Sequence, residues 1–291
     1  MADDRRTLRS ASAALIVLAA VASGCAGKKD VVPTGILEAD RFLYERGIEL
    51  LENRKWTQAR QYFEELLDNY PQSAHRPDAK IGLGDSYIGE GSIESLLVAQ
   101  NQFREFLTFY PTHARADYAQ YRLGFTHYKQ MLGADRDQTE TKEAIAEWTI
   151  FMERYPNSAL REEVAQKLRE AKDRLSESDY RVGYFYYRAK WYPGAIDRFK
   201  EVLSRDPEYS RRDAVYFYLA ESLMKVGIPA EALAYYDRLV KEFAESEHLE
   251  DAKKQIAAIK AAMGESKKDR VEPSASGADA LGLQPSGADW P

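Results

Sequence analysis

The chain of 291 residues contains a single cysteine, Cys25. One cysteine cannot form an intramolecular disulfide, and no second thiol is present to build a metal clip or a redox pair. The four histidines, His75, His113, His127 and His248, show no metal-ligand spacing, and the sequence has no nucleophile elbow, phosphate-binding P-loop or HExxH motif. The sequence therefore predicts a protein that is not an enzyme, binds no metal and needs no cofactor.

A surplus of positive charge is also missing. The formal net charge is -6 and the isoelectric point is near 5.5, whereas a nucleic-acid-binding protein usually has a basic surplus. No apolar run in the sequence, including the one at 13–22, reaches the length of about 20 residues that a membrane-spanning helix needs. These absences argue against nucleic acid as a partner and against a membrane-spanning helix.

The start of the chain has the pattern of an export signal. Three arginines lie within the first nine residues, followed by the apolar run AALIVLAAVA at 13–22 and the small residues Ser23 and Gly24. A basic start, a short apolar run and a small-residue cleavage site are typical of a secretory signal peptide.

The cysteine directly after this pattern resembles the lipobox of bacterial lipoproteins. The resemblance implies cleavage after Gly24 and a lipid on Cys25, although Ala22 stands where leucine is commoner. Ala26 follows the cysteine, and in many Gram-negative bacteria a residue other than aspartate there favours the outer membrane. The alternative is an ordinary secretory signal beside an incidental cysteine.

Five copies of one pattern follow. Each begins with alanine, has an aromatic residue four positions later and ends in a terminating position twelve positions later, spacings that put the first two on one helical stripe. The copies lie at 59–71, 99–111, 144–156, 195–207 and 232–244; the aromatic residues are Phe63, Phe103, Trp148, Phe199 and Tyr236, and the terminators are Pro71, Pro111, Pro156, Pro207 and Ala244.

A small residue precedes each copy, at Gly47, Gly84, Gly124, Gly183 and Ala220. Glycine inside a helix costs about 1 kcal/mol relative to alanine, so its recurrence predicts a close contact between helices. This arrangement resembles the tetratricopeptide repeat, which implies an all-α solenoid of five helix pairs. A four-helix bundle is the alternative, but it gives no reason for these positions to repeat.

The connection between the third and fourth copies is longer than the others by 14 residues, which we expect to form an extra helix of about 21 Å. The sequence SESD at 176–179 is typical of a capping box that opens the next helix. A last helix at about 247–262 is expected to cap the array. The predicted organisation is a signal peptide at 1–24, a lipidated linker at 25–36, repeats one to three at 37–157, a connecting helix at 158–176, repeats four and five with the cap helix at 177–263, and a disordered tail at 264–291.

Such solenoids expose a groove lined by the first helix of each pair. Counting from the small residues to the usual groove positions gives aromatic candidates in repeats three and four, with an arginine beside them. They are Tyr118, Tyr121, Phe125, Tyr128, Tyr180, Tyr184, Tyr187 and Arg188. Tyrosine and arginine are enriched in interface cores, which favours partner binding. The alternative is that these rings fill the contacts between neighbouring repeats.

The segments DYAQYRLGFTHY (117–128), YPNS (155–158) and KDRLSESDYRVGYFYYRAKWYPGAIDRFKEVL (172–203) carry a closer resemblance, to the BamD family of lipoproteins in the machinery that inserts β-barrels into the bacterial outer membrane. It covers about residues 36–262. The resemblance implies a non-enzymatic scaffold, lipid-anchored at the periplasmic face of the outer membrane. Its implied partners are the barrel-forming subunit with periplasmic domains, other assembly lipoproteins and unfolded outer-membrane proteins.

Two other functions stay open at this point. The first is a periplasmic adaptor lipoprotein for enzymes of cell-wall synthesis or division. The second, an envelope enzyme, would need a set of catalytic residues that the sequence does not show.

Overall fold

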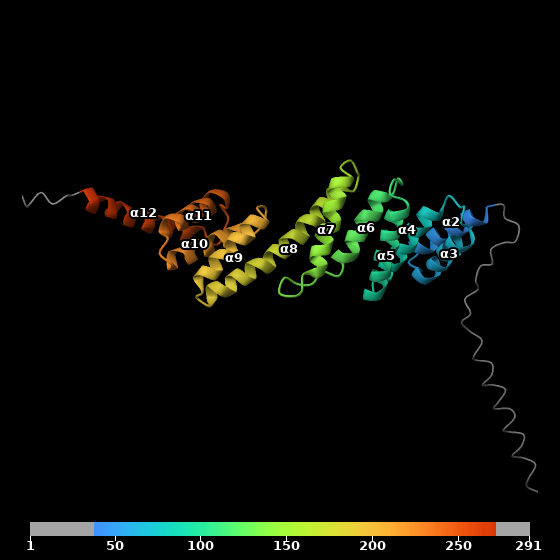
Figure 1. The fold of residues 1–291 in the computed structure, drawn as a ribbon, viewed down its shortest axis with the longest axis horizontal. Helices are drawn as coiled ribbons and strands as arrows, with labels where there is room; N and C mark the ends of the chain where they lie inside the picture. The colour runs from blue at the N-terminus through green and yellow to red at the C-terminus, as the bar shows by residue number, and fades with distance from the viewer. Residues whose placement is uncertain (1–37, 272–291) are drawn as a thin grey trace, which may run out of the picture. The chain divides into compact units, whose positions relative to one another are not determined.

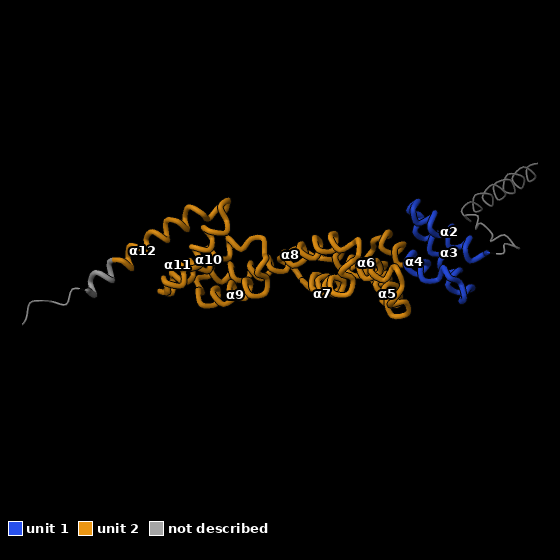
Figure 2. Tube along the Cα trace, turned by 90° about the horizontal axis from the view of Figure 1, so that it is seen from above, with its two compact units in different colours: residues 1–82 blue, residues 83–291 orange. Residues whose placement is uncertain are grey.

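The computed structural model describes residues 38–271, and this part of the chain forms eleven helices and no strand (Figure 1). The chain divides into two compact units, residues 1–82 and 83–291 (Figure 2). The predicted signal peptide, Cys25 and the linker lie outside the described residues.

The first unit contains α2 (Ala39–Glu52), α3 (Trp56–Asn69) and the first half of α4 (Arg76–Glu90). Phe63 of α3 is fully buried between the other two helices. A Cβ atom added at Gly47 or at Gly82 would lie 2.5 Å from the Phe63 ring. Only glycine lets both helices approach the ring so closely.

The second unit continues α4 and adds eight helices, each packed on the next one in the chain. Helix α8 also contacts α10, as expected for the first helices of adjacent repeats. The helices are α5 (Ile93–Phe109), α6 (Ala116–Tyr128), α7 (Thr139–Arg154), α8 (Arg161–Arg188), α9 (Tyr192–Arg205), α10 (Arg212–Lys225), α11 (Pro229–Glu242) and α12 (Leu249–Val271).

The close contact between helices that the recurring glycines predict is confirmed, and the structure shows that the partner of each glycine is an aromatic ring. A Cβ atom added at Gly84 or Gly183 would lie 2.7 Å from the ring of Phe103 or Phe199, and one at Gly124 would collide with Trp148. The side chains facing these glycines are fully buried. The all-α tetratricopeptide-repeat architecture therefore follows from one packing rule applied in successive repeats.

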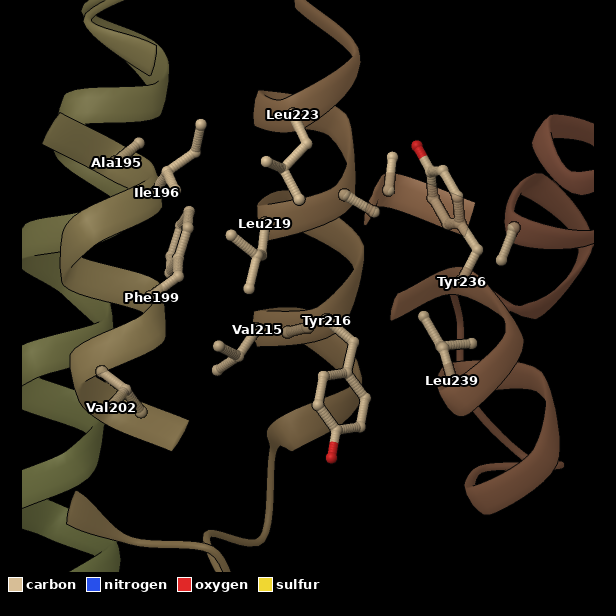
Figure 3. Close-up of a cluster of buried hydrophobic side chains, with 14 of the residues drawn as sticks. Ala195, Ile196, Phe199, Val202, Val215, Tyr216, Leu219, Leu223, Tyr236 and Leu239 are labelled. Carbon is tan, nitrogen blue, oxygen red and sulfur yellow. The ribbon is translucent and has the colours of Figure 1, made fainter. Parts of the chain in front are cut away.

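The core of repeats four and five shows the same rule in a continuous layer (Figure 3). Phe199 of α9 faces Leu219 of α10, and Tyr236 of α11 lies on the other side of α10. The start of α9 at Ala195 and the end of α10 at Leu223 lie at the same end of this layer.

The extra helical segment between repeats three and four does not end where the sequence predicts. α8 runs unbroken for 28 residues, so the SESD sequence opens no new helix. Ser176 is buried, and its hydroxyl donates a hydrogen bond to Asp206 at 2.6 Å instead of capping. Glu177 accepts hydrogen bonds from the Tyr209 hydroxyl at 2.6 Å and from Arg181 at 2.8 Å. Because other partners, on α8 itself and in the segment after α9, occupy these side chains, neither caps a new helix and α8 continues.

The last helix is also longer than the sequence predicts. α12 passes Gly264, where we expected a disordered tail to begin, and ends at Val271. Residues 265–271 contain neither proline nor glycine, so a helix already formed by packing can propagate through them. Residues 272–291 lie outside the described part.

Candidate partner-binding surfaces

Four aromatic rings form a row along α6. The ring centroids of Tyr118 and Tyr121 are 6.4 Å apart, those of Tyr121 and Phe125 are 5.9 Å apart, and those of Phe125 and Tyr128 are 6.0 Å apart. Spacings of three and four residues put all four side chains on one face of the helix. We call Tyr118, Tyr121, Phe125 and Tyr128 the α6 row.

The N-terminal end of the row is fixed to α4. The Tyr118 hydroxyl donates a hydrogen bond to Asp85 at 2.9 Å, and Arg122 donates another to the same carboxylate at 2.6 Å. Burial, reinforced by the Asp85 charge, raises the pKa of Tyr118 to about 12. The Tyr118 ring also lies beneath Arg115, whose guanidinium carbon is 4.7 Å from the ring centroid. This tyrosine therefore stays neutral and joins two successive repeats.

Two more hydroxyls of the row bind α8. Tyr121 donates to Glu163 at 2.6 Å, and Tyr128 donates to Glu170 at 2.7 Å. Burial is the main cause that raises the pKa of both tyrosines. Tyr121 is only 7% exposed, so its ring supports the contact between repeats and is not available to a partner.

Phe125 is the member of the row without a polar group, and cations surround its partly exposed ring. Arg122, Lys129 and Lys167 place their charged groups 5.3 Å, 5.7 Å and 5.5 Å from its centroid. Lys167 also lies 5.1 Å from the Tyr128 ring. Neither lysine has a carboxylate partner among the described residues. Such a surface suits a ligand that combines apolar area with negative charge.

A second aromatic cluster lies where α8 meets α10. Tyr180, Tyr184 and Tyr187 follow one another along α8, with centroids 6.0 Å and 6.2 Å apart. Tyr218 of α10 packs against Tyr184 at 4.8 Å and against Tyr187 at 5.1 Å. We call these four tyrosines the α8–α10 cluster.

Arginine 188 lies beside this cluster, as the sequence predicts. Its guanidinium carbon is 6.0 Å from the Tyr184 ring centroid, and its hydrogen bond lowers the pKa of Tyr184 below the ordinary tyrosine value. Burial has the opposite effect on Tyr218 and raises its pKa to about 12. Arg188 is exposed and has no carboxylate partner in the described part of the chain.

In three repeats, a side chain from the turn after the second helix covers an aromatic ring of the first helix. The covered ring lies three residues before the small residue, which is Gly47, Gly183 or Ala220. His75 stacks on Tyr44 at 5.0 Å, and Arg211 lies 5.6 Å from the Tyr180 centroid. His248 stacks on Phe217 at 4.4 Å with the planes nearly parallel. Each covering residue comes four positions after the terminator, so the turn of each of these repeats shields part of its own first helix.

Tyr180, under Arg211, is only 7% exposed. For Tyr121 and Tyr180, the interpretation as contacts between repeats therefore fits the structure better than partner binding. The other predicted residues, Tyr118, Phe125, Tyr128, Tyr184, Tyr187 and Arg188, are partly or fully exposed.

Sequence reasoning missed Tyr218 and the covering residues. Tyr218 lies two positions before Ala220, which is not one of the groove positions counted along a single helix. It reaches the α8 tyrosines because α8 and α10 contact each other. The run VYFYLA at 215–220 gave an aromatic signal, but the facing helix could not be identified from spacing.

Within residues 38–271, the structure contains no group of three or more His, Cys, Asp or Glu side chains that could hold a metal ion. The same residues form no helix with the length and apolar character needed to cross a membrane.

The chain belongs to the YfiO family of outer membrane lipoproteins, which matches residues 38–235. Three relatives named outer membrane protein assembly factor BamD support this placement. The Caulobacter vibrioides protein is 29% identical over 75% of this chain and 71% of its own length. The Rickettsia prowazekii protein is 27% identical over 76% and 86%, and the Vibrio cholerae protein 28% identical over 64% and 78%.

Among solved structures, the TPR2AB-domain:pHSP90-complex of yeast Sti1 is similar with a TM-score of 0.43 and 15% identity, covering 79% of this chain and 86% of that chain.

Proposed function

We propose that this protein is a non-enzymatic scaffold lipoprotein of the machinery that assembles β-barrel proteins in the outer membrane. Membership of the outer membrane lipoprotein family and the assembly role of the named relatives support this proposal. In this role, the helix pairs hold partner proteins and carry out no chemistry.

The observation that carries the proposal is the pair of aromatic surfaces, the α6 row and the α8–α10 cluster. Each offers partly exposed rings beside cations without carboxylate partners, a composition enriched in protein interfaces. The hydrogen bonds of the tyrosine hydroxyls fix the α6 row before a partner arrives, which lowers the ordering cost of binding. We propose that the α8–α10 cluster binds periplasmic domains of the barrel-forming subunit. The α6 row would bind unfolded outer-membrane segments.

The proposed location is the periplasmic face of the outer membrane, with attachment through a lipid on Cys25. The export pattern before Cys25 and the family of outer membrane lipoproteins support this location. Other assembly lipoproteins are further proposed partners.

A crosslinked pull-down of the full-length protein from its native envelope, read by mass spectrometry, tests the function. We expect a large barrel protein with periplasmic domains to be recovered. The variant Tyr184→Ala/Tyr187→Ala should reduce this recovery, and Phe125→Ala/Tyr128→Ala should reduce the recovery of unfolded substrates.

The matched control is Phe109→Ala, which removes a ring that is 70% exposed on α5, a helix that supplies no residue to either surface. Circular dichroism checks that all variants keep their helices. Recovery of cell-wall synthesis or division enzymes alone would replace the proposed role with that of a cell-wall adaptor.

A further inference from the structure

Four cations lie along one face of α8 at intervals of seven residues. They are Lys167, Arg174, Arg181 and Arg188. Because seven residues make nearly two full turns, each side chain is rotated by only about 20° from the one before it. The four side chains therefore form one stripe, which we call the α8 cation row. From its first to its last member the row covers 21 residues, a rise of about 32 Å.

The two middle cations of the row are paired within α8 but stay open to solvent. Arg174 lies 3.8 Å from Glu170, and 33% of its side chain is exposed. Arg181 lies 2.8 Å from Glu177, and 52% of its side chain is exposed. The middle of the row is thus partly neutralised, and both guanidinium groups can still accept a further partner.

The two end cations have no carboxylate partner among residues 38–271. The ammonium group of Lys167 lies 5.5 Å from the Phe125 ring centroid, and the guanidinium carbon of Arg188 lies 6.0 Å from that of Tyr184. Both rings are partly exposed. Each end of the row therefore offers a cation beside an aromatic ring, and the row joins the α6 row to the α8–α10 cluster.

The α6–α7 loop, residues 129–138, already lies on the middle of the row. Nη1 of Arg174 donates a hydrogen bond to the Leu132 carbonyl at 3.2 Å. The hydrogen bond to Glu177 raises the pKa of Arg181, and the nearby charge of Asp135 in the loop raises it further. The loop thus places one carbonyl and one carboxylate beside two successive cations of α8.

These contacts indicate what the whole row can hold. The loop reaches only the two middle cations and leaves both ends uncovered. A segment that spans about 32 Å in extended conformation needs about ten residues. Carboxylates along such a segment complement the cations, and an apolar side chain at each end complements Phe125 and Tyr184.

We propose that the α8 cation row binds an extended acidic segment of a partner protein, which displaces the α6–α7 loop from the two middle cations. The loop competes for the row and weakens the binding. The end cations, which have no internal carboxylate, supply most of the attraction. This inference rests on the contacts of α8 and not on the assembly role.

The test measures the binding of a synthetic peptide to the purified mature chain with Cys25→Ser. The probe is a fluorescein-labelled ten-residue peptide with phenylalanine at each end and alternating glutamate and glycine between. A second peptide has glutamine in place of each glutamate. Fluorescence anisotropy at low ionic strength measures both, because salt screens exposed charges. We expect the acidic peptide to bind about tenfold more tightly than the glutamine peptide.

Lys167→Ala/Arg188→Ala should weaken the binding of the acidic peptide about fivefold, because both end cations are removed. The matched control is Lys241→Ala/Lys254→Ala, which removes two exposed cations from α11 and α12, helices that supply no residue to the row. Circular dichroism checks that the variants keep their helices. Equal affinity for the two peptides, no binding, or equal losses in the two variants would each overturn the proposal.

Asp135→Asn tests the competition by the loop. It should strengthen the binding of the acidic peptide about twofold, because a carboxylate that competes for Arg181 is removed. Asp68→Asn, on the exposed face of α3, removes one negative charge elsewhere and should leave the affinity unchanged. An unchanged affinity of Asp135→Asn, or an equal gain in the control, would overturn the role of the loop. None of these outcomes affects the pull-down that tests the assembly role, so the two proposals fail separately.

Discussion

The Ser158 hydroxyl, in the turn after α7, donates a hydrogen bond to Oδ2 of Asp117 in the first turn of α6 at 2.6 Å. The same bond joins Ser246 to Asp213 at 2.6 Å, and Ser73 to Asp40 in the first repeat. In each of these repeats the serine lies two positions after the terminator and the aspartate lies seven positions before the small residue. The hydrogen bond thus joins the turn after the second helix to the start of the first helix.

Ser158→Ala should lower the free energy of unfolding by about 1 kcal/mol, because the carboxylate loses a hydrogen bond in a partly buried setting. Urea denaturation followed by circular dichroism measures the change. Ser204→Ala, on the exposed face of α9, is the matched control and should change the stability by less than about 0.5 kcal/mol. Equal effects of the two substitutions would remove the fastening role.

Gly183→Ala should cost about 1–3 kcal/mol, because the new methyl group would lie 2.7 Å from the Phe199 ring in a filled core. Gly264→Ala on α12 meets no atom within 4 Å and should instead stabilise the chain by up to about 1 kcal/mol. Both are measured by denaturant unfolding. A neutral Gly183→Ala would mean that the glycine–aromatic contact does not determine the spacing of the helices.

The stability of repeat four should depend on pH through Asp206. Burial alone would raise the pKa of Asp206, but hydrogen bonds from Arg169 and Ser176 outweigh it and lower the pKa below the ordinary aspartate value. The carboxylate therefore stabilises the fold above the ordinary pKa of about 4, and this contribution is lost as the pH falls through the lowered folded-state pKa.

Asp206→Asn should therefore destabilise the protein at pH 7, and the difference from the unmodified chain should shrink between about pH 5 and pH 3. Unfolding curves at several pH values measure it. A difference that stays constant over this range would show that Asp206 acts through packing alone.

Cys25→Ser should leave the protein in the periplasmic fraction, because a serine cannot accept the thioether-linked lipid. Cell fractionation with antibody detection measures the distribution. Persistent membrane association of this variant would contradict lipid attachment at Cys25.

The helix pairs could be predicted from sequence because one local rule, a glycine facing an aromatic ring, repeats along the chain. The continuity of α8 could not be predicted. SESD at 176–179 is a plausible capping box in the sequence, and only the folded chain brings Asp206 to Ser176 and Tyr209 to Glu177. The candidate surfaces were predictable only residue by residue. Whether Tyr180 is open or shielded depends on Arg211, 31 residues further along the chain.

The unbroken α8 sets a fixed separation between the two candidate surfaces. Its N-terminal half supplies Lys167 to the α6 row, and its C-terminal half supplies Tyr184 to the α8–α10 cluster. Seventeen residues separate them, which is about 26 Å along a helix axis. Two proteins bound to these surfaces at once would both contact α8. The distance between them and their relative orientation would then be determined by this single helix.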